Sequence, residues 1–429
     1  MMADVSQCRV GICGLGTVAS ATYNLLTRYA PLIQSRTGTD VTVVHVGCRR
    51  DHPDCDLSNV RVSRDIFDVV RDPEVDVVLE LIGGTDPALA LVREALATGK
   101  HVVTANKALI AEFGAELFDL ADTNNVSIRY EAAVAGGIPV IKAIREGLVG
   151  NEISRVAGII NGTTNFILSE MEGVGNRGFD EVLAEAQELG YAEADPTFDV
   201  EGIDAAHKLT ILSTIAFGVP LEFEAIYTEG ISQVTVADIR FAEQLGYKIK
   251  HLGITARDGE GVELRVHPTL VPNSALLAQV SGVMNAVMVT SNAAGETMYY
   301  GAGAGGDATG SAVVSDVVDI ARDHLGIPSA GYGASDMTTL PIKLIEDIES
   351  PFYLRLTARD KPGVMASLTS ILSRYNISIE SLVQRDANAD EVPVVIITNR
   401  VRESAMNAAL AEISEQSSVT GGITRIRVL

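Results

Sequence analysis

The stretch Val10-Gly-Ile-Cys-Gly14-Leu-Gly16-Thr-Val-Ala19 decides the fold of the first part of the chain. Its spacing fits G-x-G-x-x-G/A, the pattern that opens a dinucleotide-binding βαβ unit. The apolar run 8–12 before it predicts a strand, and a helix is expected to follow the glycines. The first glycine permits a tight turn, the second lets the backbone approach a pyrophosphate, and the small third residue allows close helix–strand packing. We predict a nucleotide site here; the alternative is an ordinary glycine-rich turn.

Strands and helices alternate after this stretch. Apolar runs at 41–46, 75–82, 101–104 and 127–130 predict strands, and residues 88–98 have helical character. This alternation predicts parallel βαβ units, and hence a doubly wound α/β sheet of the Rossmann type. We assign residues 1–135 to this NAD(P)-binding domain. Residues 304–345, with a helix over 312–321 behind the glycine cluster 301–306, are expected to complete it.

The end of the second strand bears on the choice of cofactor. An Asp or Glu there usually holds the ribose 2′-hydroxyl of NAD, whereas this chain has Gly47-Cys-Arg49-Arg50-Asp51. Arginine can hold a 2′-phosphate, so Arg49 and Arg50 favour NADP. Asp51 keeps NAD open, and the two arginines are alternatively an ordinary solvated pair.

The rest of the chain divides near Pro351. Residues 350–429 carry nine Lys/Arg and eight Asp/Glu, whereas the whole chain carries 33 and 56. Strands at 352–357, 377–383, 394–398 and 423–428, with helices at 364–375 and 403–412, give the order βαββαβ of a ferredoxin-like sandwich. Residues 136–303 are left as a mixed α+β domain for substrate binding, catalysis and dimerisation.

Composition excludes several classes of partner. A net charge of −23 argues against nucleic acid and anionic membrane surfaces. The four cysteines all fall in the first 55 residues, which leaves no disulfide framework elsewhere and favours a reducing cytoplasm. The first ten residues do not resemble a signal peptide. The uncharged run 268–295 contains two prolines and several Asn and Ser, so we interpret it as core or subunit interface.

Two lysines are the candidates for chemistry. Lys107 follows the strand at 101–104, and the ligand crevice of such a sheet lies at the carboxyl ends of its strands. The i, i+4 spacing of Asp204 and Lys208 places them on one face of a helix at 202–217. An acidic cluster that includes Glu193 and Asp199 lies upstream. Each feature alone is more often a solvated surface feature; their co-occurrence behind a dinucleotide fold favours a catalytic site.

These motifs together resemble one family, homoserine dehydrogenase, in its longer bacterial form with a C-terminal ACT domain. The resemblance covers essentially the whole chain, with Ala19 in place of the usual third glycine. In chain order the matching blocks are Gly11-Ile-Cys-Gly-Leu-Gly-Thr-Val18, Glu80-Leu-Ile-Gly-Gly84, Val102-Val-Thr-Ala-Asn-Lys107, Tyr130-Glu-Ala-Ala-Val-Ala-Gly-Gly-Ile-Pro139, Asn161-Gly-Thr-Thr-Asn165, Leu189-Gly-Tyr-Ala-Glu-Ala-Asp-Pro196, Asp199-Val-Glu-Gly-Ile-Asp-Ala-Ala-His-Lys208 and Gly301-Ala-Gly-Ala-Gly305.

The resemblance implies the reversible reduction of L-aspartate 4-semialdehyde to L-homoserine by NAD(P)H, on the route to threonine, methionine and isoleucine. It implies that Lys208 is the general acid/base, with Lys107 and Asp204 beside it. The implied substrate-binding residues are Glu193, Asp199, Gly162 and Thr163. The implied cofactor-binding residues are Gly14, Gly16, Thr17, Val18, Arg49, Arg50, Gly83, Thr104, Lys107 and Gly303.

The resemblance also implies a sodium ion, held by the Glu131 side chain and by backbone oxygens of Val134, Gly136 and Ile138. Oxygen-only ligation suits a hard cation, although the segment is alternatively a plain turn. Family members dimerise through the segment that contains run 268–295, so a dimer or tetramer is expected. The tail implies an amino-acid effector at the ACT domain, which we take to be L-threonine, unless the domain is only structural.

Two competing readings stay open at this point. One is a dehydrogenase for a related small amino acid or aldehyde. The other, from a different class, is a non-catalytic amino-acid sensor that joins a Rossmann relic to an ACT module. The presence of Lys107, Glu193, Asp204 and Lys208 argues against the sensor.

Overall fold

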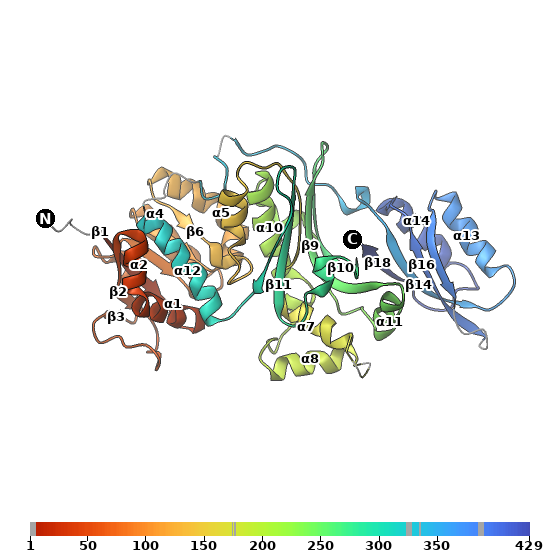
Figure 1. Cartoon of the computed structure of the whole chain (residues 1–429), viewed down its shortest axis with the longest axis horizontal. Coiled ribbons are helices and arrows are strands. Elements are labelled where there is room, and N and C mark those ends of the chain that lie inside the picture. Colours follow the sequence, from red (N-terminus) through yellow and green to blue (C-terminus); the bar gives the residue numbers. More distant parts are fainter. Residues whose placement is uncertain (1–5, 174, 176, 323–327, 334–335, 385–389) are drawn as a thin grey trace.

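The computed structural model describes residues 6–322 except 174 and 176, and residues 328–333, 336–384 and 390–429. Three regions lie in a row: a parallel sheet wrapped by helices, an antiparallel sheet, and a small C-terminal α+β unit (Figure 1). Residues 1–5, which belong to the start that was expected not to be a signal peptide, lie outside the described residues. So do residues 323–327 and 334–335 of the segment 304–345. In the described part of the chain, no helix is long and apolar enough to cross a membrane.

The N-terminal region is the doubly wound sheet that the sequence predicts. All its strands run parallel in the order β3-β2-β1-β4-β5-β6, the Rossmann order. The strand predicted over 75–82 is shorter, and β3 was not predicted because it has only three residues. The strands are β1 (Ser6–Cys13), β2 (Thr39–Gly47), β3 (Arg61–Ser63), β4 (Val77–Glu80), β5 (His101–Thr104) and β6 (Ile128–Arg129).

Helices cover both faces of this sheet, and two apolar cores result, one on each side. Apolar side chains of β1 and β4 alternate between the two cores, as the pleat of a buried parallel strand requires. The helices of this region are α1 (Thr17–Arg28), α2 (Ala30–Thr37), α3 (Phe67–Arg71), α4 (Ala88–Ala97) and α5 (Lys107–Thr123).

A late helix, α12 (Gly306–Ala321), returns to this region and packs beside α1 (Figure 1). It begins six residues before the predicted start, inside the glycine cluster that was expected to break the pattern. The reason is close packing: a Cβ on Gly306 would lie 3.2 Å from the Thr17 carbonyl oxygen, and one on Gly310 3.1 Å from the Thr22 nitrogen. The glycines therefore let the two helices approach.

The middle region is an antiparallel sheet in the order β12-β11-β7-β9-β10. β10 pairs along its whole length with β9. The uncharged run 268–295 lies partly in β10 and β11, whose side chains are mostly buried, which agrees with its interpretation as core. The strands are β7 (Ile153–Ile159), β9 (Tyr247–Arg257), β10 (Val262–Pro272), β11 (Met284–Ser291) and β12 (Gly295–Ala302).

Most of the chain between β7 and β9 is helical. The central helix, α10, is buried along nearly its whole length. Its N-cap Gly202 has φ +85°, and a Cβ there would stand 3.0 Å from both His251 and Thr228, so the position requires glycine. These helices are α7 (Gly162–Met171), α8 (Phe179–Glu188), α9 (Thr197–Val200), α10 (Ile203–Phe217) and α11 (Val236–Gln244).

The C-terminal region has the predicted βαββαβ order. Its sheet order is β18-β14-β16-β15, with the last strand beside the first, which is the ferredoxin-like arrangement. One face packs against its two helices. Its main elements are β14 (Phe352–Arg359), α13 (Val364–Arg374), β15 (Ile379–Gln384), β16 (Glu391–Thr398), α14 (Glu403–Ser414) and β18 (Thr424–Val428).

The two sheets are continuous, which the sequence did not predict. The last strand, β18, pairs in parallel with β10 of the middle sheet. Next to this junction, the buried Arg427 guanidinium donates to Glu403 at 2.8 Å and to Glu229 of the middle region at 2.9 Å. The Arg427 guanidinium also lies 4.7 Å from the ring centre of Tyr227.

Candidate active site

The glycine turn after β1 has the geometry that a pyrophosphate needs. Gly14 has φ +95°, and a Cβ there would stand 3.0 Å from the Leu81 carbonyl oxygen, so only glycine fits. Gly16 is the N-cap of α1, and no atom lies within 4 Å of the place where its Cβ would stand. Thr17 and Val18 form the first turn of α1. The open space above Gly16, at a helix N-terminus, suits an anion.

A cavity of about 970 Å³ opens beside this turn. Arg49 and Arg50 are exposed on its lining, as the second-strand argument predicts, and Gly83 also lines it. Arg64, which the sequence analysis missed, is on the same wall. The lining residues are Gly14, Leu15, Gly16, Gly47, Cys48, Arg49, Arg50, Arg64, Asp65, Ile66, Phe67, Leu81, Ile82, Gly83, Asp86 and Pro87.

Asp51, which left NAD as an alternative cofactor in the sequence, has an ion-pair partner in this structure. Arg64 donates to its two carboxylate oxygens at 2.9 and 3.3 Å. The hydrogen bonds from Arg64 hold the pKa of the Asp51 carboxyl below its usual range. In the described part of the chain, Arg49 and Arg50 have no such carboxylate partner. The three arginines therefore outnumber Asp51 and Asp65 at this end of the cavity.

Thr104, a predicted cofactor residue, is fully buried rather than on the cavity wall. Its hydroxyl donates to Glu80 at 2.6 Å and accepts from the backbone N–H of Asn106 at 2.9 Å. Glu80 also accepts the backbone N–H of Ile82 at 3.0 Å. Burial raises the pKa of Glu80. Thr104 and Glu80 thus fix the carboxyl ends of β4 and β5, which form the edge of the site.

One buried carboxylate brings the two candidate lysines together. Asp204 accepts from the Lys208 ammonium at 2.8 Å and lies 3.1 Å from the Lys107 ammonium. Burial alone would raise the pKa of Asp204, but Lys208 and Lys107 lower it well below its usual range. Lys208 comes from α10 and Lys107 from the start of α5, so the sheet and the middle region meet here. The juxtaposition of Lys107, Asp204 and Lys208 agrees with the sequence-based expectation.

The Lys208 ammonium is fixed by a second contact. Besides Asp204, it donates to the carbonyl oxygen of Ile160 at 2.7 Å, just beyond β7. An ammonium has three donors, so one remains for a ligand. The Lys208 side chain is 12% exposed, whereas that of Lys107 is 32% exposed. Lys107 also lies 5.6 Å from the ring centre of Phe198.

The predicted substrate residues divide into two groups. The single proton of the Thr163 hydroxyl is shared between the carbonyl oxygen of Tyr191, at 2.6 Å, and Asp199, at 3.3 Å. Gly162 begins the same helix, α7. Glu193 lies exposed on the segment between α8 and α9. In the described part of the chain, no hydrogen bond or ion pair joins its side chain to Asp199 or Asp204.

Asn161 was not singled out from the sequence. It lies between β7 and α7 and donates to both Asp199, at 2.8 Å, and Asp204, at 2.7 Å. Burial raises the pKa of Asp199, and the hydrogen bond from Asn161 opposes this rise. The sequence signal was its place at the start of the block 161–165, one of the blocks that resemble the family.

The residues expected to hold sodium lie together after β6. The Glu131 carboxylate accepts the backbone N–H groups of Ile141 and Lys142, each at 2.9 Å. Burial, followed by the negative charge of Asp316, raises the pKa of Glu131 to about 8. The intervening Ala135 and Gly136 have φ +55° and +48°, so the chain turns sharply. The predicted backbone ligands Val134, Gly136 and Ile138 belong to this turn.

These residues fit a monovalent cation. The Glu131 carboxylate is 1% exposed and destabilised by burial, so a positive charge beside it would favour its ionised form. Its oxygens have lone pairs left after the two backbone hydrogen bonds. In the described part of the chain, no cluster of three or more His, Cys, Asp or Glu side chains could hold a metal ion. Backbone oxygens would therefore have to supply most of the ligands.

The glycine loop before α12 contacts this turn. The carbonyl oxygen of Gly303 stands 2.5 Å from where a Cβ on Gly136 would lie. A Cβ on Gly303 would lie 2.1 Å from Cγ of the buried Asn285, so a side chain at 303 would displace the loop. The loop thus lies between the cation-site turn and the beginning of β11.

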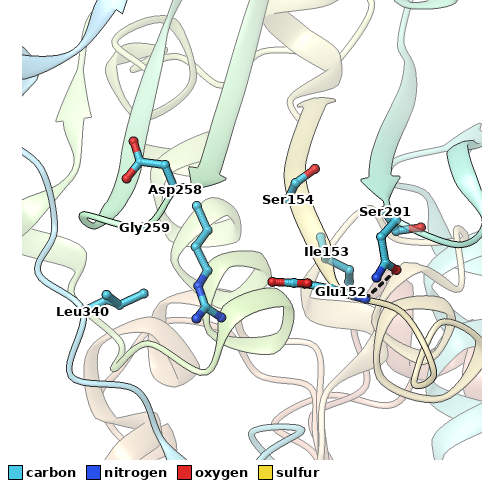
Figure 2. A pocket seen from close by; sticks show the side chains of 9 residues that line it. Glu152, Ile153, Ser154, Asp258, Gly259, Ser291 and Leu340 are labelled. Atoms are coloured by element: carbon cyan, nitrogen blue, oxygen red, sulfur yellow. Dashed lines mark hydrogen bonds between the residues drawn. The ribbon is translucent and has the colours of Figure 1, made fainter.

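A smaller cavity, of about 360 Å³, lies at the far end of the middle sheet, near the beginning of β7 and the end of β9. Figure 2 shows the side chains of Glu152, Asp258 and Leu340 around it. It contains none of the predicted site residues, and we assign no function to it.

A Rossmann sheet, a cavity sized for a dinucleotide and a lysine–carboxylate cluster at its edge define the class: an NAD(P)-dependent oxidoreductase. The comparisons with family models agree. The model described as "Homoserine dehydrogenase, NAD binding domain" matches residues 14–131, that of homoserine dehydrogenase matches 139–318, and that of the ACT domain matches 352–415.

Relatives at high identity extend over the whole chain. A homoserine dehydrogenase from Pseudomonas aeruginosa is 54% identical, with 98% of each chain covered. The solved structure of a homoserine dehydrogenase from Thiobacillus denitrificans is 51% identical, with a TM-score of 0.94 over 99% of this chain and 98% of that one. The chain belongs to the homoserine dehydrogenase family. The catalytic interpretation is thereby confirmed over that of a non-catalytic sensor.

A third comparison concerns the cofactor. A hyperthermophilic archaeal homoserine dehydrogenase mutant was solved in complex with NADPH. It is 27% identical, with a TM-score of 0.62, and covers 73% of this chain and 97% of its own. Together with the matched NAD-binding domain, this supports a nicotinamide cofactor.

Proposed function

We propose that this chain interconverts L-aspartate 4-semialdehyde and L-homoserine with Lys208 as the general acid/base. The observation that carries this role is the Lys208 ammonium, which is fixed by Asp204 and Ile160 and keeps one donor free. When bound, the nicotinamide cofactor supplies or accepts the hydride. Lys208 would give a proton to the substrate oxygen in reduction, and in oxidation its neutral amine would accept the proton of the alcohol.

Lys107 would act beside it as a fixed positive charge. Its ammonium shares Asp204 with Lys208 and has more exposure to the crevice. A cation at this place would stabilise negative charge that develops on the substrate oxygen; one good donor is worth about 3–4 kcal/mol in such sites. Asp204 positions both lysines.

The amino-acid end of the substrate would lie toward α7. Asp199 is a carboxylate whose hydrogen-bond donors in the described structure, Asn161 and Thr163, are both neutral, so it can pair with the substrate ammonium. Gly162 and Thr163 lie at the N-terminus of α7, where free backbone N–H groups suit a carboxylate. Glu193 is exposed at 191–196 and would contribute from that segment.

We propose NADP as the preferred cofactor, with NAD as the second choice. Gly14, Gly16, Thr17 and Val18 would hold the pyrophosphate, and Gly83 and Gly303 would lie near its other end. Arg49 and Arg50 would hold the 2′-phosphate, and the pairing of Asp51 with Arg64 supports this preference. Thr104 would act indirectly, through Glu80.

A sodium ion at Glu131, Val134, Gly136 and Ile138 is part of the proposal. It is supported by the buried carboxylate and by the sharp turn that presents backbone oxygens. The turn that would hold the ion contacts the loop that carries Gly303.

The remaining assignments concern organisation. We propose a NAD(P)-binding domain over 1–135 completed by 304–345, a catalytic and dimerisation domain over 136–303, and a regulatory ACT domain over 350–429. We also propose that the ACT domain binds an amino acid, L-threonine, as a feedback inhibitor. The edge strand β12 exposes 56% of Tyr300, which supports a dimer or tetramer built on this sheet. All four cysteines are free thiols, which supports a cytoplasmic location.

The decisive experiment is spectrophotometric. Reduced nicotinamide is followed after addition of L-homoserine with NADP⁺ or NAD⁺ at alkaline pH, with related hydroxy amino acids as controls. A homoserine-dependent rise that is faster with NADP⁺ is the expected result. No rise with either cofactor, in protein shown to be folded, would overturn the proposed reaction. Added L-threonine, compared with L-valine, tests the effector in the same assay.

A further inference from the structure

Asn161 occupies the junction between the middle sheet and the catalytic cluster. It lies between the end of β7 and the first residue of α7, and it is 4% exposed. Its side-chain oxygen accepts the backbone N–H of Thr164 at 2.8 Å, the usual N-cap hydrogen bond. This bond fixes which way the amide faces, because the oxygen must point toward the helix.

With the oxygen so fixed, both amide protons face carboxylates. Nδ2 donates to Oδ1 of Asp199 at 2.8 Å and to Oδ2 of Asp204 at 2.7 Å. The same oxygen of Asp204 accepts from the Lys208 ammonium. A single amide group therefore joins the proposed substrate carboxylate to the oxygen that holds the proposed acid/base.

The charges around Asp199 explain why this bridge matters. Burial and the negative charge of Asp204 raise the pKa of Asp199, whereas hydrogen bonds from Asn161 and Thr163 and the charge of Lys208 lower it. The negative charge of Asp204 is balanced by two ammonium groups, Lys208 at 2.8 Å and Lys107 at 3.1 Å. The side chains that donate to Asp199, those of Asn161 and Thr163, carry no charge. The ionised state of Asp199 therefore depends on Asn161 more than that of Asp204 does.

We propose that Asn161 is a positioning residue that holds the carboxylates of Asp199 and Asp204 side by side, both ionised, so that the substrate ammonium binds next to Lys208. The inference rests on the proposed roles of Asp199 and Lys208. It assigns no contact between Asn161 and substrate; the residue acts through the two aspartates.

The test compares two substitutions in the full-length chain. Asn161→Asp keeps an oxygen to cap α7 but removes both donors, and Asn161→Ser keeps the cap with at most one donor. For Asn161→Asp we expect kcat/KM for L-homoserine to fall at least roughly tenfold to a hundredfold, because two hydrogen bonds to carboxylates are lost and a third negative charge is placed beside them. The acidic limb of the pH profile of kcat/KM should move up by about one pH unit. Asn161→Ser should lie between Asn161→Asp and the unmodified chain.

Controls separate positioning from folding. Asn124→Ser is the matched control, because Asn124 caps the distant end of α5 and its side-chain amide donates to the Leu120 carbonyl at 2.8 Å; it should leave the pH profile unchanged. A purely structural role of Asn161 would lower the melting temperature and leave the pH profile and KM of the folded fraction unchanged, and that result would overturn the inference.

Asp199→Asn distinguishes failure of the inference from failure of the proposed function. If Asp199 binds the ammonium, this variant loses the acidic limb and raises KM. If the limb persists in Asp199→Asn, the role assigned to Asp199 is wrong and the inference falls with it. If the acidic limb of the pH profile is lost in Asp199→Asn but stays at the same pH in both Asn161 variants, only the inference about Asn161 is wrong.

Discussion

Replacement of Lys208 by alanine is the sharpest test of the active site. The Lys208 ammonium donates to Asp204 and to the Ile160 carbonyl, and its third proton is the one available to substrate. Loss of a general acid costs roughly 10²- to 10⁴-fold in rate, which is about 3–5 kcal/mol of activation free energy. We therefore expect kcat to fall by that factor in Lys208→Ala.

The variant should still fold. Asp204 retains Lys107 at 3.1 Å and the Asn161 amide at 2.7 Å, so its buried charge is not left alone. We expect the free energy of unfolding to fall by about 1–3 kcal/mol for each of the two hydrogen bonds that the ammonium makes, to Asp204 and to the Ile160 carbonyl. Cofactor affinity should be unchanged, because the glycine turn belongs to α1 and the parallel sheet.

The assay is steady-state oxidation of L-homoserine, with cofactor binding measured by fluorescence titration and stability by thermal unfolding. Lys248→Ala is the matched control: Lys248 pairs with Glu172 at 3.5 Å, away from the site, and the variant should keep full turnover. Near-normal kcat in Lys208→Ala would refute the acid/base assignment. A larger loss in Lys107→Ala than in Lys208→Ala would show that the two lysines exchange roles.

Three further predictions concern the cofactor and the cation. Gly16→Ala should weaken cofactor binding and leave the melting temperature unchanged, because the space above Gly16 is open. Gly14→Ala should lower both the cofactor affinity and the melting temperature, because a Cβ there meets the Leu81 carbonyl. Cofactor titration and thermal unfolding of both variants check this. Arg49→Ala should lower the ratio of kcat/KM for NADP⁺ over NAD⁺ by roughly tenfold or more, the cost of one charge-assisted contact, and an unchanged ratio would remove Arg49 from the phosphate site. Glu131 has a folded pKa of about 8, above its unfolded value, so the folded state binds the extra proton and stability should fall as pH rises from about 4.5 to 8. In choline buffers this slope should be seen, and in sodium it should be smaller. Glu131→Gln should reduce the slope to the part that Asp316 contributes, because burial also raises the pKa of Asp316 to about 6. A slope equal in both salts would argue against the cation.

The nucleotide fold was within reach of the sequence alone. The glycine spacing after a short apolar strand is a local pattern, and the glycine turn and the strand order follow from it by general rules of βαβ units. The βαββαβ order of the last 80 residues was likewise legible from the alternation of apolar runs. Asp204 and Lys208 could be paired because four residues along a helix place side chains on one face.

Tertiary structure alone decided the contacts between distant segments. Lys107 reaches Asp204 only because α5 and α10 pack together, and Arg64 reaches Asp51 across a loop. Asn161 begins the block 161–165 in the sequence, but its two carboxylate partners lie 38 and 43 residues away, and only the fold brings them to it. The pairing of β18 with β10 was equally hidden, because a strand's apolar pattern does not specify which edge it joins. Local periodicity therefore determined the elements, and long-range packing decided which charged groups meet.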